Sequence, residues 1–561
     1  MEVDALSIVL TIAIALALAY IQLSKSEPDF HPLLLQQQSV PTPIRNEGES
    51  AIHRPKSTTL GGSLVKHPSD KIKTLYDVWQ AGSAIDPSAR SIMYLLQNQF
   101  ALMDNTFEQV GHRIDGFGSG FISLTGLKPK TETPVGIMTP YSQESFIAQQ
   151  AFYRYSFVAV PIHDLRNSEL LIEVVNQTKL KAMLVSQKVL PLLLQSLKDL
   201  PSLKTIIVAG VFISAEQTKL AAQHGAKVVK YARVEYDGLL NPLEHVKPDP
   251  EDVAMINYNT KSTSLSKGVM LTHANLVAAM TAFKASLPES KKFTHRDRLL
   301  CQFSNGDVIA VWLSSLVILA GGSLVFPSGL MKNVLHDSQA SAPTIFASTP
   351  VILERIHEAL QLTYGKGSLF KRAFASKLAI LKAGRVTTTS LWDFIGLGEI
   401  RTRLGGKVRL IVTTNPTKRE TLEYIRAAMG IRVISTYGRT ETSGIATSCN
   451  MFDYSSTTQH VGAPVGCNEI KLVDDVESGF ISADEPNPRG EILIRGPNVM
   501  KGYFKKPNAT STAVDKDGWF HTGELGTFHP NGTLEVSDKK KKKTKSAAAG
   551  SSSPVPGETK E

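Results

Sequence analysis

A run of hydroxyl and lysine side chains lies near the middle of the chain, between two apolar segments. Residues 258–268 read Tyr-Asn-Thr-Lys-Ser-Thr-Ser-Leu-Ser-Lys-Gly, after an apolar run at 253–256 and before an amphipathic run at 272–283. A strand, a polar loop and a helix in this order can hold phosphate, because loop hydroxyls and N–H groups donate to its oxygens and Lys267 adds charge. The alternative is a surface loop with one solvated lysine, because phosphate loops usually need glycine and this one keeps only Gly268.

A second polar turn ends a strand-like segment at 433–444, which reads Val-Ile-Ser-Thr-Tyr-Gly-Arg-Thr-Glu-Thr-Ser-Gly. The hydroxyl of Thr440 beside the carboxylate of Glu441 can hold Mg²⁺ and a phosphate oxygen at the end of a strand. Taken alone, Tyr-Gly-x-Thr-Glu is equally compatible with a plain turn. Its place after the loop at 258–268 and before a third motif at 517–526 favours the phosphate site.

The elements that must position these turns alternate between short apolar runs and helical spacing. Helical spacing occurs at 107–124 and 145–155. Short apolar runs occur at intervals that suit parallel strands joined by crossover helices, at 135–138, 157–162, 181–185, 205–211 and 226–229. This pattern predicts an α/β fold.

The stretch at 258–268 is similar to the phosphate loop of the AMP-forming acyl-CoA synthetase superfamily, whose pattern is Tyr-Thr-Ser-Gly-Thr-Thr-Gly-x-Pro-Lys-Gly. Lys261 and Ser264 replace two glycines of that pattern, and Ser266 replaces its proline. The leader resembles that of fungal-type long-chain members. The resemblance implies the large N-terminal domain of an adenylate-forming enzyme at 70–536, with parallel sheets, flanking helices and a small β subdomain.

The resemblance also implies a role for each motif residue. Tyr437 is expected to stack on adenine, and Glu524, in place of the family's aspartate, to accept the ribose hydroxyls. Asn415 stands in the adenine-binding turn, where the family has Ser-Gly-Ala-Ala-Pro. Catalytic and phosphate-binding roles fall on Lys267, Thr440, Glu441, Ser262, Thr263 and Gly268, with Glu441 as the metal ligand.

The N-terminal segment predicts a membrane anchor. The uncharged run Ala5 to Leu23 has about the 20 residues that span a bilayer, and Lys25 follows it. We therefore expect a single-pass helix at 1–25, a linker at 26–69 and a cytosolic body at the endoplasmic reticulum membrane. A hydrophobic helix docked on the body is the alternative.

Composition limits the remaining classes. The net charge of +10 derives largely from the lysine run at 539–545, which does not predict nucleic-acid binding by the body. The three scattered cysteines indicate a reducing compartment. Residues 537–561 are expected to be a truncated hinge and a disordered Lys-rich tail, without the C-terminal domain of the family.

Two functions remain open from the sequence. The first is a membrane-anchored long-chain fatty acyl-CoA synthetase that uses ATP, Mg²⁺ and CoA to convert a fatty acid to acyl-AMP and then acyl-CoA. The second is a weak or inactive relative that acts as an acyl- or nucleotide-binding membrane scaffold. If the first holds, a protein partner is expected to supply the missing function. Six substitutions relative to the family pattern favour the second, namely Lys261, Ser264, Asn305, Thr414, Asn415 and Lys539.

Overall fold

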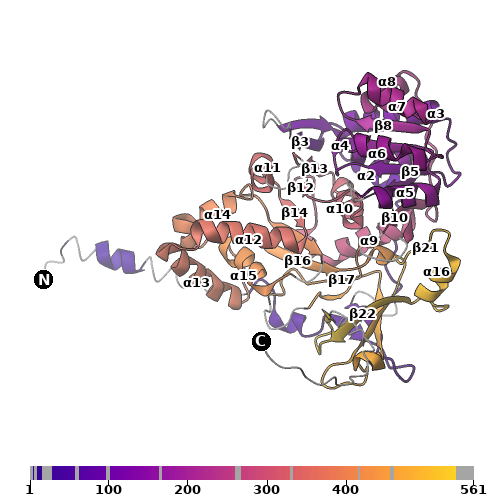
Figure 1. The fold of residues 1–561 in the computed structure, drawn as a ribbon. Helices are drawn as coiled ribbons and strands as arrows, with labels where there is room; N and C mark the ends of the chain where they lie inside the picture. Colours follow the sequence, from indigo (N-terminus) through magenta and orange to yellow (C-terminus); the bar gives the residue numbers. More distant parts are fainter. Residues whose placement is uncertain are drawn as a thin grey trace, which may run out of the picture.

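The structure is a computed structural model of the chain. It describes residue 4 and residues 9–15, 28–56, 62–95, 102–162, 167–258, 267–328, 333–414, 417–454 and 460–537. The described residues form three sheets with helices packed between and around them (Figure 1).

The first sheet has the strand order β21-β11-β10-β6-β5-β7-β8-β9. Pairing is parallel from β10 through β9, and β11 and β21 add antiparallel strands at the other side. The strands are β5 (Pro134–Met138), β6 (Val158–Pro161), β7 (Ala182–Ser186), β8 (Thr205–Ala209), β9 (Lys227–Lys230), β10 (Val253–Tyr258), β11 (Gly268–Thr272) and β21 (Gly502–Tyr503). The five parallel strands predicted from apolar runs are confirmed to within two residues.

The helices associated with this sheet begin at strong capping signals. Thr106, Ser142 and Thr272 each cap a helix by accepting a hydrogen bond from the backbone of the third helical residue. The helices are α3 (Phe107–Thr125), α4 (Gln143–Arg154), α5 (Ser168–Thr178), α6 (Leu190–Ser196), α7 (Ala215–Gln223), α8 (Tyr231–Leu240) and α9 (His273–Ser286), with short η3 (Leu197–Asp199) and η4 (Glu289–Lys291).

The second sheet has the order β18-β17-β16-β15-β14-β12-β13-β3-β4, with parallel pairing from β16 to β3. Its strands are β3 (Arg90–Leu95), β4 (Leu102–Thr106), β12 (Arg298–Cys301), β13 (Ser323–Phe326), β14 (Ile345–Ser348), β15 (Leu410–Thr414), β16 (Arg432–Tyr437), β17 (Thr447–Ser448) and β18 (Ala463–Pro464). Its helices are α2 (Leu75–Ser83), α10 (Val308–Leu319), α11 (Val334–Ser341), α12 (Pro350–Tyr364), α13 (Ser368–Lys382), α14 (Gly398–Thr402) and α15 (Arg419–Ala428), with a π-helical turn η6 (Asp393–Leu397).

One hydrophobic core joins these two sheets. Its members include Ile137 and Leu184 from the first sheet, Val412 and Ile434 from the second, and the fully buried Trp312 of α10 between them. The two sheets are therefore fixed relative to each other by packing, and strands β10 and β16 present their carboxyl ends from a common body.

The third sheet is antiparallel, with the order β1-β2-β19-β20-β22-β23. It contains β1 (Ser39–Pro41), β2 (His53–Pro55), β19 (Glu469–Val473), β20 (Arg489–Arg495), β22 (Phe520–Phe528) and β23 (Leu534–Ser537), accompanied by η8 (Val476–Ser478) and α16 (Pro507–Ala513). It corresponds to the small β subdomain that the resemblance implied.

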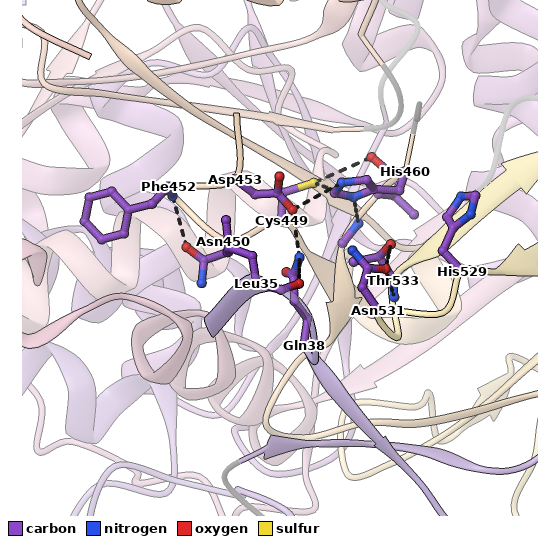
Figure 2. A network of polar contacts seen from close by, with 12 residues as sticks. Leu35, Gln38, Cys449, Asn450, Phe452, Asp453, His460, His529, Asn531 and Thr533 are labelled. Atoms are coloured by element: carbon purple, nitrogen blue, oxygen red, sulfur yellow. Dashed lines mark hydrogen bonds and ion pairs between the residues drawn. The ribbon is translucent and has the colours of Figure 1, made fainter. Parts of the chain in front are cut away.

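The leader differs from the linker expected at 26–69, because β1 and β2 belong to this third sheet and η1 (Pro32–Leu35) precedes them. The Gln38 amide donates to Asp453 at 2.7 Å, and the same carboxylate accepts from His460 at 3.3 Å (Figure 2). The oxygen Oδ2 of Asp29 accepts from Arg432 and Tyr454. All these partners lie about 400 residues further along the chain, where local sequence patterns cannot reveal them.

The two chain ends are described in part. Residues 9–15 are helical and exposed, and most of the anchor expected at 5–23 lies outside the described residues. Within the described part of the chain, no helix combines the length and apolar character needed to span a bilayer. The predicted tail at 538–561 also lies outside the described residues.

Candidate active site

Glu441 is a buried carboxylate with one oxygen unsatisfied. The residue is 5% exposed and lies in η7 (Thr440–Thr442), the short helical turn that follows β16. The Tyr503 hydroxyl donates to its Oε1 at 2.9 Å, whereas Oε2 has no hydrogen-bond partner among the described residues. Because a buried carboxylate oxygen is costly to leave unpaired, this atom marks a place for a donor or a cation.

The turn that carries Glu441 is rigid. The carbonyl of Arg439 accepts from the backbone N–H groups of Thr442 and Gly444, and the Asn498 amide donates to the carbonyl of Thr442. Gly438 enters the turn where a Cβ atom would lie 2.4 Å from the backbone nitrogen of Ile445. Only glycine fits there without displacing backbone, so the turn requires the glycine of the Tyr-Gly-x-Thr-Glu motif.

Glu524 lies on β22 and already makes one hydrogen bond and one ion pair with residues of this turn. The Tyr437 hydroxyl donates to its Oε2 at 2.5 Å, and the Arg439 Nη1 lies 2.8 Å from its Oε1. Burial and then the Glu524 carboxylate raise the pKa of Tyr437 well above its usual value, so the phenol keeps its proton. The ribose-binding role expected of Glu524 stays a prediction.

Tyr437 itself is 3% exposed, and its ring packs in the core of the third sheet with Ile470, Leu472 and Ile492. Its hydroxyl is the part that reaches Glu524. The structure therefore places the ring within the protein core, and the predicted stacking on adenine stays a prediction.

Arg439 occupies the variable position of the motif and was missed by the sequence analysis. Burial lowers the pKa of its guanidinium, but the carboxylates of Glu524 and Glu441 outweigh burial and raise that pKa above its ordinary value. A charged residue between two motif residues is the sequence signal that would have identified it. Tyr503, the second missed residue, lies on β21 and had no distinguishing signal beyond its neighbouring aromatic, Phe504.

Lys267 reaches the same region from the first sheet. Its Nζ atom lies 4.9 Å from the centroid of the Tyr503 ring, the arrangement of a cation–π contact. Gly268 begins β11, and a Cβ there would approach both Ile256 and Tyr258 to 2.8 Å. Glycine is therefore required at the end of the loop, as the phosphate-loop pattern has it.

Several predicted site residues cannot be placed. Ser262, Thr263 and Asn415 lie outside the described residues. Thr440 is half-buried, one residue before Glu441 in η7. Of the predicted residues, Lys267 and Glu441 line the same pocket, and Tyr437 is hydrogen-bonded to Glu524. Arg439 lines the pocket and also contacts Glu524.

A pocket of about 610 Å³ lies between these groups. Two cations, Lys267 and Arg439, line it together with the carboxylate of Glu441. Its described lining consists of Lys267, Arg439, Glu441, Glu491, Tyr503, Asn508, Ala509, Thr512, Ala513, Phe520, His521, Thr522 and Gly523. The volume and the mixture of cations, hydroxyls and one unsatisfied carboxylate oxygen suit a phosphorylated ligand.

The donor set suits Mg²⁺ in one respect. Among the described residues, no three His, Cys, Asp or Glu side chains form a cluster that would hold a metal without a further ligand. Mg²⁺ is usually bound through one or two carboxylates together with substrate phosphates, and the free Oε2 of Glu441 provides one such carboxylate oxygen.

Comparisons with known proteins agree with this arrangement. Residues 95–504 match the AMP-binding enzyme family. The chain is 34% identical to long-chain-fatty-acid–CoA ligase 5 of Rattus norvegicus over 484 residues, which cover 85% of this chain and 70% of the relative. It is 33% identical to long-chain-fatty-acid–CoA ligase 6 of Homo sapiens over 490 residues, covering 86% and 69%.

The fold is likewise shared with solved structures. A long-chain-fatty-acid–CoA ligase from Archaeoglobus fulgidus aligns with a TM-score of 0.64 at 20% identity, over 85% of this chain and 86% of that one. The A domain of a carboxylic acid reductase from Segniliparus rugosus aligns with a TM-score of 0.66 at 16% identity, over 84% and 76%. Adenylate-forming acyl-CoA ligases use ATP, Mg²⁺ and CoA. The sequence matches and the fold together place the chain in the AMP-binding enzyme family, among the AMP-forming long-chain acyl-CoA synthetases.

Proposed function

We propose that the chain is a membrane-anchored long-chain fatty acyl-CoA synthetase whose nucleotide site is the pocket between Lys267 and Glu441. The observation that carries the proposal is the convergence of two cations and a carboxylate with a free oxygen on one pocket. In the proposed reaction, a fatty carboxylate attacks the α-phosphorus of ATP, and the bond to pyrophosphate breaks. The thiol of CoA then displaces AMP from the acyl group.

Each charged group has a distinct task in the first step. Lys267 stabilises negative charge on the phosphate oxygens, and Glu441 provides the carboxylate oxygen for Mg²⁺, which neutralises the phosphates when bound. Glu524 accepts from the ribose hydroxyls through lone pairs that Tyr437 and Arg439 leave open, because the two oxygens of a carboxylate offer about four acceptor sites. Catalysis of this kind depends on positioning and on charge stabilisation.

Palmitate-dependent exchange between ATP and pyrophosphate tests this proposal. We expect exchange by the wild-type chain and its loss in Lys267→Ala and Glu441→Ala. Lys292→Ala and Glu289→Ala are matched controls, because they remove one exposed ion pair that does not line the pocket. Exchange no greater than in the two pocket variants would contradict the proposal.

The second candidate is a scaffold that binds acyl groups or nucleotide without turnover. The substitutions Lys261 and Ser264 favour it. So does Glu524, whose carboxylate already contacts Tyr437 and Arg439. Nucleotide binding without exchange would establish this function. Exchange without acyl-CoA formation would instead leave the thioester step to a partner protein.

Membrane anchoring rests on the apolar run at 5–23 and on the fixed leader behind it. Asp29 binds this leader to Arg432 at the start of β16, so the described leader begins fixed to the body. We expect Leu10→Asp with Ile14→Asp to reduce flotation with phosphatidylcholine vesicles, and Leu33→Asp to leave it unchanged. Equal flotation of the wild type, the Leu10→Asp/Ile14→Asp variant and Leu33→Asp would contradict anchoring by this segment.

A further inference from the structure

The pocket contains two unsatisfied buried atoms of opposite hydrogen-bonding character. The Nε–H of Arg439 has no acceptor, and the Oε2 of Glu441 has no donor, among the described residues. The two atoms lie 3.8 Å apart, too far for a hydrogen bond with each other. Other arginine Nε atoms of the described residues also have no hydrogen-bond acceptor, but among the residues with such atoms only Arg439 and Glu441 line the pocket, where one ligand can reach both.

The remaining contacts of Arg439 hold it beside the pocket without satisfying it. Its Nη1 lies 2.8 Å from Glu524, and its backbone caps the rigid turn through Thr442. The guanidinium is therefore held by a residue that the proposed function assigns to ribose. A ligand whose ribose hydroxyls hydrogen-bond to Glu524 would compete with this ion pair. The guanidinium would then be available to a second acceptor.

A phosphate oxygen meets both requirements at once. It accepts from the Arg439 Nε–H, and a cation bound to the same phosphate satisfies the Glu441 Oε2. Guanidinium groups suit phosphate because their N–H donors form a planar fork, and hydrogen bonds between charged partners are stronger than neutral ones. The ion pair with Glu524 keeps the guanidinium in place until such a ligand arrives.

We propose that Arg439 is a phosphate-binding residue of this pocket, held by Glu524 in the free protein and transferred to the nucleotide phosphate nearest the ribose on binding. This inference rests on the proposed nucleotide site. It adds to that site a phosphate-binding residue at the variable position of the motif. It makes the residue between Gly438 and Thr440 a determinant of selectivity for nucleotides over nucleosides.

Calorimetric titration with AMP and with adenosine, each with and without Mg²⁺, tests the assignment. We expect the wild-type chain to prefer AMP. Arg439→Ala should weaken AMP binding roughly 10- to 100-fold, because a hydrogen bond between charged groups is lost. The same variant should bind adenosine about as well as the wild type, because the assignment places Arg439 on the phosphate and on no part of the nucleoside. A purely structural role for Arg439 would weaken both ligands together.

Two further variants keep the test decisive. Arg439→Lys retains the charge without the fork, so its ratio of AMP to adenosine affinity should lie between those of the wild type and Arg439→Ala. If Arg439→Ala does not fold, the ratio of AMP to adenosine affinity in Arg439→Lys alone tests the assignment. Arg489→Ala is the matched control, because Arg489 also pairs with a carboxylate, that of Asp484 at 2.7 Å, and does not line the pocket.

The outcomes separate this inference from the proposed function. An unchanged ratio of AMP to adenosine affinity in both Arg439 variants would overturn the inference, even where palmitate-dependent exchange persists. A ratio that depends on Arg439 without any exchange would support the inference and contradict the synthetase. A wild-type chain that binds neither AMP nor ATP would overturn both.

Discussion

Gly438 shows how strongly one residue controls the site. It joins Tyr437, whose ring is buried in the third sheet, to Arg439, whose side chain lines the pocket. The backbone of Ile445 lies so close that no side chain fits at position 438. The turn thus couples core packing on one side to the placement of two charged groups on the other.

A single added methyl group at this glycine should therefore be costly. We expect Gly438→Ala to lower the free energy of unfolding by about 1–3 kcal/mol, because the Cβ meets backbone atoms that must move. The same movement displaces Arg439 and Glu441, so nucleotide binding should weaken as well. Urea denaturation and AMP titration measure the two effects.

Gly111 provides the comparison. It lies within α3, and a Cβ there meets nothing within 4 Å. Gly111→Ala should raise the free energy of unfolding by roughly 0.5–1 kcal/mol, because alanine favours the helix over glycine. Equal effects of the two substitutions would show that the close approach to Ile445 does not constrain the turn.

At the scale of elements, the leader ribbon, strands β1 and β2, is attached to the rest of the third sheet partly through a buried histidine. His53 of β2 is stacked on Phe528 of β22, with ring centroids 3.7 Å apart. The Ser39 hydroxyl donates to the carbonyl of Gly532 and lies 2.8 Å from His53 Nδ1, so it accepts from that nitrogen. Nδ1 therefore carries a hydrogen, and burial, which lowers the pKa of the ring, keeps the imidazole neutral at neutral pH.

This attachment should weaken in acid. Burial lowers the pKa of His53 to about 4, from 6.5 in the unfolded chain. Between these values the unfolded state binds more protons, so the free energy of unfolding falls as the pH drops from about 6.5 to 4. The full stabilisation is present above pH 6.5, and the loss reaches on the order of 3 kcal/mol at pH 4.

We expect His53→Gln to lose less stability than the wild type between pH 7 and pH 4, measured by urea denaturation. His273, whose pKa burial lowers to about 3, retains its own acid dependence in both proteins, so the difference isolates His53. His521→Gln, at a partly exposed site on β22, should behave as the wild type. An equal acid loss in His53→Gln and the wild type would rule out this account of the ribbon.

The elements also show what local sequence can and cannot predict. Strands β5 to β9 were predictable, because each is a short run of mainly apolar residues that can be recognised from the local sequence alone. Strands β1 and β2 were not, because each has three residues and the strand that joins them to the sheet, β19, pairs with β2 across more than 400 positions. Lys267 and Glu441 were predicted as site residues from their motifs. Arg439 and Tyr503 were identified only from their tertiary contacts.

At the scale of the whole molecule, the pocket draws on all three sheets. Lys267 and Tyr503 come from the edge of the first sheet, Glu441 from the turn after the second, and Glu491 and Thr522 from the third. The shared core holds the first two sheets together, and the leader contacts bind the third sheet to residues next to the second. A site assembled in this way forms only when the entire fold is in place.

The direct test of this account is calorimetric titration of the full chain with magnesium–ATP, paired with the shift in melting temperature. We predict saturable heat and a raised melting temperature for the wild type, since a ligand that binds the folded state stabilises it. Glu441→Gln should weaken binding in the presence of Mg²⁺ and leave binding in its absence nearly unchanged. No heat and no shift at saturating magnesium–ATP would contradict the central claim that Lys267, Arg439 and Glu441 form a nucleotide site.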